Sequence, residues 1–209
     1  MDELDDVLAA AQRQGFLGPA SVAEHRRHAL GFAAGWEDLP PLALDLGSGG
    51  GVPGLVLAVE YPTLSVCLVD SRERSTDWLT EAVRSLGLSN RVAVVRARGE
   101  ELGRDLQWRA QVPMVVARGF GPPAVVAECG APLLVTGASM VVSEPPTPDA
   151  SRWPRAGLGE LGLGLGRRWA HGGSHYQELV QLAPCPERFP RRVGVPAKRP
   201  LWEWVRARP

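Results

Sequence analysis

Cysteine and histidine are scarce in this chain, and their scarcity excludes several kinds of site. The three cysteines are widely separated and form no Cys-x-x-Cys pair: Cys67, Cys129 and Cys185. Neither a disulfide framework nor a zinc site is therefore indicated. The four histidines are also too scattered to indicate a metal centre: His25, His28, His171 and His175. We expect reduced thiols and no metal.

Long apolar runs are absent as well. No stretch approaches the roughly 20 apolar residues that a membrane-spanning helix requires. The first six residues include four acids, whereas a secretory signal begins with basic residues. The chain has 209 residues, of which 44% are hydrophobic and 22% charged, and this composition is typical of a globular protein with one core domain. We expect a cytoplasmic protein that has no membrane partner.

Lysine is almost absent, because all but one of the 23 basic residues are arginine. The formal net charge is zero, which by itself argues against a nucleic-acid-binding protein, but the charges are unevenly distributed. Residues 1–60 hold nine acids and three bases, whereas residues 185–209 hold seven bases and two acids. This basic C-terminal tail indicates a negatively charged partner.

Two helices precede a regular alternation of strands and helices. We predict the helices at residues 2–14 and 21–34, and Pro40-Pro41 ends this region. From Leu42 onward, short apolar runs alternate with helical stretches, which is typical of βαβ units around a parallel sheet. The predicted strands are 42–46, 64–69, 91–96, 112–117 and 138–144, and the predicted helices between them are 53–60, 71–86, 100–105 and 122–133.

The last part of the chain is predicted to form a β-hairpin. Residues 145–154 are rich in proline and predict a loop, and residues 158–170 and 175–183 predict antiparallel strands joined at Gly172-Gly173. The chain is therefore predicted to be an α/β protein with a Rossmann-like, doubly wound, mostly parallel sheet that ends in an antiparallel hairpin. A short N-terminal helical extension precedes the sheet.

A glycine-rich loop follows the first predicted strand. Asp45 precedes Leu46-Gly47-Ser48-Gly49-Gly50-Gly51-Val52-Pro53-Gly54, and such glycines let the backbone approach a ligand where any Cβ would collide. Asp70 ends the second strand, where a carboxylate accepts hydrogen bonds from ribose hydroxyls.

Three interpretations of this loop are open. Gly49, Gly51 and Gly54 satisfy the G-x-G-x-x-G pattern of dinucleotide sites, so the glycines alone do not separate S-adenosylmethionine from NAD, or either from a structural turn. Asp45 is placed to reach a ligand amino group, and the chain lacks room for the second domain of a dehydrogenase. These two points favour the methyl donor.

Several segments together resemble the RsmG family, also called glucose-inhibited division protein B. Members of this bacterial family methylate N7 of a guanine in 16S ribosomal RNA. The similarity extends over about residues 27–201 and rests on five motifs: Asp45-Leu46-Gly47-Ser48-Gly49-Gly50-Gly51-Val52-Pro53-Gly54, Val69-Asp70-Ser71, Arg98-Gly99-Glu100-Glu101, Ala117-Arg118-Gly119-Phe120, and Phe189 to Leu201.

The resemblance implies an S-adenosylmethionine-dependent methyltransferase of class I, and it divides the chain into three parts. Residues 1–41 form the helical extension, 42–184 the cofactor-binding domain and 185–209 the basic tail. The family's cofactor contacts fall on Gly47, Val52, Gly99, Glu100 and Arg118. With the acids and glycines already described, the expected cofactor site comprises Asp45, Gly47, Gly49, Gly51, Val52, Asp70, Gly99, Glu100 and Arg118.

Two of these residues have simpler interpretations. Glu100 is otherwise a solvated acid in the first turn of a helix, and Arg118 is otherwise a surface arginine paired with Glu144. We expect Arg118 to be the catalytic residue, because its guanidinium can donate to guanine O6 or to a phosphate without using the N7 lone pair.

The basic tail is the expected contact for 16S ribosomal RNA or the small ribosomal subunit. Its candidate RNA-binding residues are Arg191, Arg192, Lys198 and Arg199. Trp202 and Trp204 are expected either to stack on unpaired bases or to pack the tail onto the domain. A methyltransferase for another RNA or a small molecule, an inactive cofactor-binding RNA or assembly module, and an NAD-dependent oxidoreductase remain as alternatives.

Overall fold

The strands form one mixed sheet. The computed structural model describes residues 2–147 and 149–204, and its sheet has the order β3-β2-β1-β4-β5-β7-β6. The strands β1 to β5 pair with one another in parallel, and β7 is antiparallel to both β5 and β6. The strands are β1 (Leu42–Leu46), β2 (Ser65–Asp70), β3 (Val92–Arg96), β4 (Val112–Ala117), β5 (Leu134–Glu144), β6 (Leu163–His171) and β7 (Ser174–Gln181).

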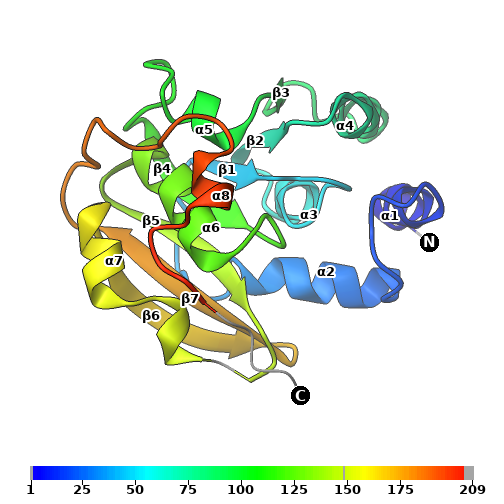
Figure 1. Ribbon diagram of the computed structural model, residues 1–209. Coiled ribbons are helices and arrows are strands. Elements are labelled where there is room, and N and C mark those ends of the chain that lie inside the picture. The colour runs from blue at the N-terminus through cyan, green and yellow to red at the C-terminus, as the bar shows by residue number, and fades with distance from the viewer. Residues whose placement is uncertain (1, 148, 205–209) are drawn as a thin grey trace.

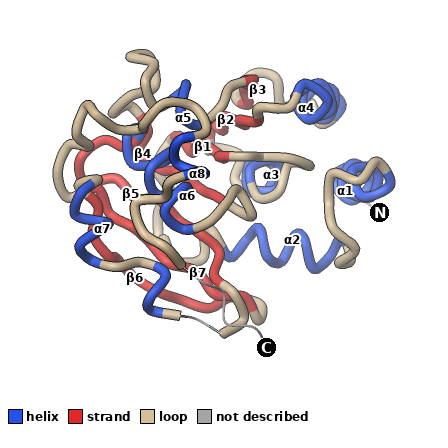
Figure 2. Tube along the Cα trace, viewed as in Figure 1, coloured by secondary structure: helices blue, strands red, loops and turns tan. Residues whose placement is uncertain are grey.

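Helices cover both faces of this sheet (Figures 1 and 2). One face is covered by α2 (Val22–Gly31), α3 (Gly54–Glu60) and α4 (Glu73–Ser85), with α1 (Glu3–Arg13) packed outside α2 and α3. The other is covered by α5 (Gly99–Leu102), α6 (Pro123–Gly130) and α7 (Arg155–Glu160). The predicted fold class, including the doubly wound sheet and the closing hairpin, is confirmed.

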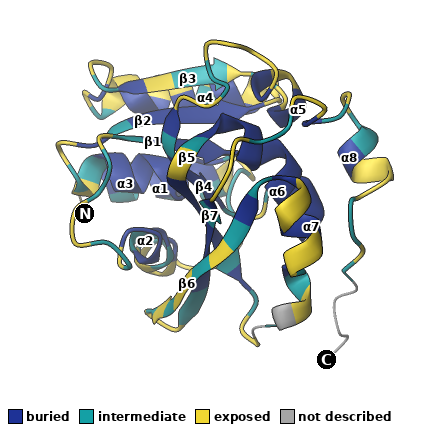
Figure 3. Ribbon diagram, turned by 90° about the vertical axis from the view of Figure 1, so that its left-hand side faces the viewer, coloured by how far each residue is buried: buried dark blue, intermediate teal, exposed yellow. Residues whose placement is uncertain are grey.

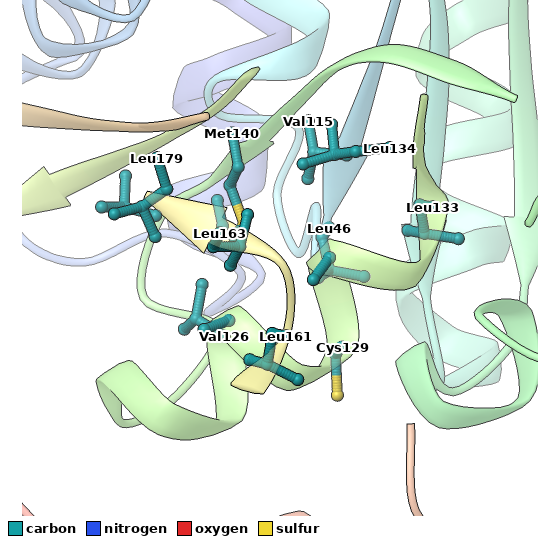
Figure 4. Packing of buried hydrophobic residues seen from close by; sticks show 14 of the residues in the cluster. Leu46, Val115, Val126, Cys129, Leu133, Leu134, Met140, Leu161, Leu163 and Leu179 are labelled. Atoms are coloured by element: carbon teal, nitrogen blue, oxygen red, sulfur yellow. The ribbon is translucent and has the colours of Figure 1, made fainter. Parts of the chain in front are cut away.

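The apolar runs of the strands supply two cores at once. Successive side chains of a strand point to opposite faces, so a strand covered on both sides is apolar at nearly every position, as β1 is apart from the buried Asp45. In β1, Leu44 and Leu46 face the α6 side, and Ala43 faces the α3 side. Figure 4 shows Leu46 and Val115 of the sheet packed with Val126 and Cys129 of α6.

Most element boundaries lie within a residue or two of the prediction, and five differ further. Two of the five are helix ends, because α2 ends at Gly31 instead of residue 34 and α5 ends at Leu102 instead of residue 105. Residues 158–160 belong to α7 rather than to a strand, because Leu158 and Leu161 are buried at helical spacing, and Gly162 turns the chain at φ 75°. β5 begins at Leu134 instead of residue 138. The helix predicted at residues 122–133 ends at Gly130, and a short 3-10 helix, Ala131–Leu133, completes it.

The N-terminal helices are fastened to α3. Arg26 of α2 pairs with Asp2 at 2.6 Å, with Asp5 at 2.8 Å and with Glu60 at the end of α3. Val52 and Val56 pack against the apolar face of α1. The helical extension is therefore part of the same packed body as the sheet.

The described part of the C-terminal segment also packs on the domain. Arg109 donates hydrogen bonds to the carbonyl oxygens of Cys185, Pro186 and Phe189 at 2.8–3.1 Å. A short helix, α8 (Val195–Lys198), then lies against α6. All eight residues of α6 are buried as a result, which Figure 3 shows in dark blue. Among the described residues, no helix is long and apolar enough to cross a membrane.

Candidate functional site

A cavity of about 420 Å³ opens at the carboxyl ends of the central strands. It lies where the strand order reverses between β1 and β4, which is the usual ligand position in open α/β sheets. Its volume falls within the roughly 300–1,000 Å³ of small-molecule sites. The lining residues come from the ends of β1 to β4 and from α5, α6 and α8: Leu46, Gly47, Val69, Asp70, Ser71, Arg72, Ala97, Arg98, Gly99, Glu100, Gly119, Phe120, Val125, Cys129 and Ala197.

The glycine loop forms the floor of this cavity through Gly47. Its φ is 79°, and a Cβ there would lie 2.6 Å from the ring of Phe120. Only glycine permits both this backbone conformation and this close approach. The N–H groups of Gly47 and Ser48 donate to the carbonyl oxygen of Val69 at 2.8 and 2.9 Å, so the loop is tied to the end of β2.

Asp70 presents a carboxylate to the cavity with acceptor capacity left over. Its Oδ2 accepts the Gly49 N–H at 3.0 Å, and its Oδ1 accepts the Arg72 N–H at 2.9 Å. The residue is only 6% exposed, and these bonds fix the orientation of its side chain. A carboxylate has about four acceptor positions, so Asp70 can still accept hydrogen bonds from ligand hydroxyls.

Glu100 also lines the cavity and is not a solvated acid. It is 8% exposed, and its Oε1 accepts the backbone N–H of Gly194 at 2.9 Å. The interpretation of Glu100 as a solvated first-turn residue is therefore wrong. This bond joins the C-terminal segment to the cavity, where Ala197 of α8 also contributes to the wall.

Asp45 lies behind the cavity wall. It has no exposed surface, its Oδ2 accepts the Gly54 N–H at 2.9 Å, and its Oδ1 receives no hydrogen bond from the described residues. Burial raises the pKa of this carboxyl to about 7. A Cβ at Gly54 would lie 2.7 Å from Oδ2, so the glycine makes this contact possible.

Four other residues of the predicted cofactor set are also absent from the wall: Gly49, Gly51, Val52 and Arg118. Gly49 orients Asp70 through its N–H, and Val52 packs with α1 and α2. The structure therefore brings Gly47, Asp70, Gly99 and Glu100 to the cavity and places the rest of the loop behind it.

Arg118 contacts the N-terminal extension instead of Glu144. Its Nη2 lies 3.0 Å from Nδ1 of His25, whose Nε2 lies 3.1 Å from the Gly18 carbonyl oxygen. Because a carbonyl oxygen only accepts, Nε2 carries the proton and Nδ1 accepts from the guanidinium. Burial lowers the pKa of Arg118. Glu144 instead accepts from Arg152 and Trp153, so the predicted alternative pairing is wrong.

The four candidate RNA-binding residues of the tail divide into two groups. Arg191 donates from its backbone N–H and its Nε to Oε1 of Glu128, and from Nη2 to Oε2, at 2.6–2.8 Å. Glu128 is fully buried, so we reassign Arg191 from RNA binding to holding the segment on α6. The other three candidates are exposed: Arg192, Lys198 and Arg199.

The tail tryptophans pack on the domain. Trp202 covers Gly157, and its Nε1 donates to the carbonyl oxygen of Arg152 at 3.0 Å. Nε1 of Trp204 donates to Asp149 at 2.9 Å. Of the two expectations for these residues, packing onto the domain describes both.

Sequence reasoning missed several cavity residues, chiefly Phe120, Cys129 and Ala197. Phe120 follows β4 directly, and its position after a parallel strand was an available signal. Cys129 and Ala197 lie on helices whose approach to the cavity depends on packing, so no local pattern identifies them. Burial raises the pKa of Cys129, which is consistent with a wall residue rather than a nucleophile.

The comparison with protein families agrees with this geometry. Residues 20–144 match the model of the family described as rRNA small subunit methyltransferase G. The chain belongs to this family. The protein named ribosomal RNA small subunit methyltransferase G from Chloroflexus aggregans is 35% identical over 189 residues, which cover 87% of this chain and 79% of the relative. The protein of the same name from Roseiflexus castenholzii is 36% identical, with 86% and 79% covered.

Solved structures show the same fold at low sequence identity. Cofactor-bound Rv0187 from MTB has a TM-score of 0.60 at 19% identity, with 87% of this chain and 90% of that chain covered. A SAM-dependent O-methyltransferase from Thermotoga maritima has a TM-score of 0.57 at 14% identity, with 87% and 73% covered. The family resemblance and the class I methyltransferase fold predicted from the sequence are confirmed.

Proposed function

We propose that this chain transfers the methyl group of S-adenosylmethionine to N7 of a guanine in 16S ribosomal RNA. Family membership supports the cofactor and the class of substrate. The observation that carries the proposal is the cavity at the ends of β1 and β2, with the carboxylates of Asp70 and Glu100 among its lining residues. As ribosomal RNA is the proposed substrate, we propose the cytoplasm as the place of action.

The residues of the cavity fit an adenosine-containing cofactor. Asp70 retains acceptor positions for ribose hydroxyls, and Glu100 Oε2 and the Gly99 backbone are suited to the polar edge of an adenine. Phe120, Val125 and Cys129 offer apolar surface for its faces. Gly47 has no side chain and so leaves room for the cofactor at the floor of the cavity. S-adenosylmethionine supplies, when bound, a methyl group on a positively charged sulfur.

Methyl transfer to guanine N7 requires the protein mainly to orient the two reactants. Guanine N7 already carries a lone pair, so its attack on the methyl carbon requires no general base and no covalent enzyme intermediate. No Lewis acid is required either, and we propose a reaction without metal. Holding two reactants in line is worth roughly 7–11 kcal/mol, so the role of this chain is to bind, orient and exclude water.

Arg118 is the proposed residue that acts between cofactor and substrate. Its guanidinium has five N–H donors, and one hydrogen bond from it, to His25, is formed within the described residues. The remaining donors are suited to guanine O6 or to a flanking phosphate. His25 holds the guanidinium from the side of α2, so the N-terminal extension belongs to the proposed site.

The exposed cations of the tail are the proposed RNA contacts. Arg192, Lys198 and Arg199 lie on the segment that walls the cavity, so an RNA strand held there passes the cavity mouth. Contacts of this kind act on phosphates and depend steeply on salt concentration.

The experiment that tests the proposal has two readouts. S-adenosylhomocysteine is expected to raise the melting temperature of the protein, and NAD is not. Tritium from labelled S-adenosylmethionine is then expected in 16S ribosomal RNA of small subunits that lack the modification. Stabilisation by NAD alone would overturn the cofactor assignment, and tight binding without tritium transfer would favour an inactive assembly module.

A further inference from the structure

A second cavity, of about 310 Å³, adjoins the first at the ends of β4 and β5. The two cavities share Gly119 and Phe120 on their walls. The residues that line the second cavity include three aromatic residues, Phe120, Trp153 and Trp204, and the acid Glu144. A ligand bound there would therefore lie directly beside a ligand in the first cavity.

Glu144 is the one acid in this wall, and half of its carboxylate has no partner. Its Oε1 accepts from Nε1 of Trp153 at 2.8 Å and from Nε of Arg152 at 3.2 Å. Its Oε2 is buried and receives no hydrogen bond within residues 2–147 and 149–204. The side chain has no exposed surface. A buried acceptor without a donor is costly, so a ligand donor at this point would satisfy it.

We propose that the second cavity binds the target guanine and that Glu144 recognises its Watson–Crick edge. This inference rests on the proposed function and deepens it. Guanine presents two adjacent donors, N1–H and the N2 amino group, to an acceptor such as Oε2. Adenine presents the lone pair of N1 at the same place, which a carboxylate repels. Glu144 is therefore a specificity-determining residue that favours guanine over adenine.

The orientation that Glu144 imposes suits transfer to N7. N1 is an atom of the six-membered ring and N2 is the amino group attached to that ring, whereas N7 lies in the five-membered ring, on the Hoogsteen edge of the base. A guanine held by its Watson–Crick edge at Glu144 can direct N7 toward the wall shared with the first cavity. Phe120 offers a face for stacking, as in other sites that bind an unpaired or flipped-out base.

The surroundings of Glu144 favour a base over a phosphate or a purely structural role. A phosphate would meet a buried carboxylate, whose charge repels it. A structural role requires only Oε1, because Arg152 and Trp153 both donate there. Arg152 itself is held at 4.4 Å over the ring of Trp204. The free oxygen is thus the part of Glu144 that packing does not explain.

The substitution Glu144→Gln separates the two roles. The donors of Arg152 and Trp153 keep the amide oxygen at the Oε1 position, so an NH₂ group replaces the free acceptor. We expect methyl transfer to guanine to fall about 10- to 100-fold in kcat/KM, and the preference for guanine over adenine to narrow. Binding of S-adenosylhomocysteine and the melting temperature should change little. Glu178→Gln is the matched control, because Glu178 is a buried glutamate that pairs with Arg167 and Ser139 away from both cavities.

The assay uses small subunits reconstituted with guanine or adenine at the position that the wild-type protein methylates. A second arm needs no protein variant: 1-methylguanine at that position removes the N1–H donor, and wild-type activity should fall at least tenfold. Unchanged activity on 1-methylguanine, or a folded Glu144→Gln protein with the full rate and full preference for guanine, overturns the inference. Neither result affects the proposed function, which fails only if the wild-type protein transfers no methyl to N7.

Discussion

Two buried glutamates, Glu128 on α6 and Glu144 at the end of β5, differ in how their carboxylates are satisfied. Both oxygens of Glu128 accept hydrogen bonds from Arg191, whereas Glu144 has donors on Oε1 alone among the described residues. The saturated acid holds the C-terminal segment in place. The half-satisfied acid lies at the end of β5 and lines the second cavity. Its unpartnered Oε2 thus separates Glu144 from Glu128, both of whose oxygens are used to hold the scaffold together.

Breaking the saturated pair is expected to have the largest effect. Arg191→Ala leaves Glu128 buried without its cation, which typically costs about 3–5 kcal/mol of folding free energy. Urea unfolding followed by circular dichroism measures the loss. Arg192→Ala, at the exposed neighbouring position, should change stability by no more than about 0.5 kcal/mol. Equal effects of the two variants would show that the pairing with Glu128 is not what holds the segment.

The ionisation of Asp45 is expected to make stability depend on pH. Burial raises the pKa of this carboxyl from its ordinary value of 3.8 to about 7 in the folded protein, so the folded state binds the proton more tightly than the unfolded state does. The resulting stabilisation is complete below about pH 4 and is lost as the pH rises through about 7. At about 1.4 kcal/mol per pKa unit, the loss amounts to a few kcal/mol.

Asp45→Asn removes this dependence, because the amide does not ionise. The stability of the variant relative to the wild type should therefore rise between pH 4 and pH 8. Denaturant unfolding at several pH values provides the measurement. Parallel stability curves for the two proteins would mean that Asp45 is ionised in the folded state at all of these pH values.

Loss of Asp70 is expected to weaken cofactor binding with a smaller free-energy effect. Hydrogen bonds to a charged group are worth about 1.5–3 kcal/mol each, so Asp70→Ala should raise the Kd for S-adenosylhomocysteine about 100-fold in calorimetric titration. Asp77→Ala, at an exposed position on α4, is the control. A Kd within threefold of the wild type would remove Asp70 from the proposed ribose site.

Much of the fold follows from the sequence, because strands buried on both faces are apolar at nearly every position. The bounds of β1 and β4 match their predictions for this reason. The prediction of a strand from residue 158 onward was wrong, because the alternating Gly and Leu residues there satisfy the strand period as well as the helical one. The site was harder to predict. Asp70 follows from its place after a strand, but the pairing of Arg118 with His25 depends on tertiary packing.

The same dependence on tertiary packing explains why the sequence alone does not reveal the roles of Arg191 and Glu144. In the sequence, the arginines of the basic tail cannot be told apart. Only the position of α6 shows that Arg191 pairs with the buried Glu128. Glu144 ends a strand, as Asp70 does, yet its free oxygen is apparent only once Arg152 and Trp153 occupy the other. Sequence position indicates which acids approach the site, and the hydrogen bonds show which have capacity left for a ligand.

The exposed tail cations should give the smallest effect per residue. Replacing Arg192, Lys198 and Arg199 together by Gln is expected to reduce the slope of log affinity for ribosomal RNA against log salt by about two to three. Filter binding at several salt concentrations measures this slope. Arg84→Gln, on α4 at the opposite face of the sheet, should leave it unchanged. An unaltered slope in the triple variant would assign RNA binding to another surface.

The most direct test of the proposed activity is mass spectrometric mapping of 16S ribosomal RNA from cells that carry the gene and from cells that lack it. One fragment should be 14 mass units lighter without the gene, and chemical cleavage specific for N7-methylguanine should locate the missing methyl group. Identical spectra from the two strains, or a missing methyl at a position other than guanine N7, would contradict the proposal.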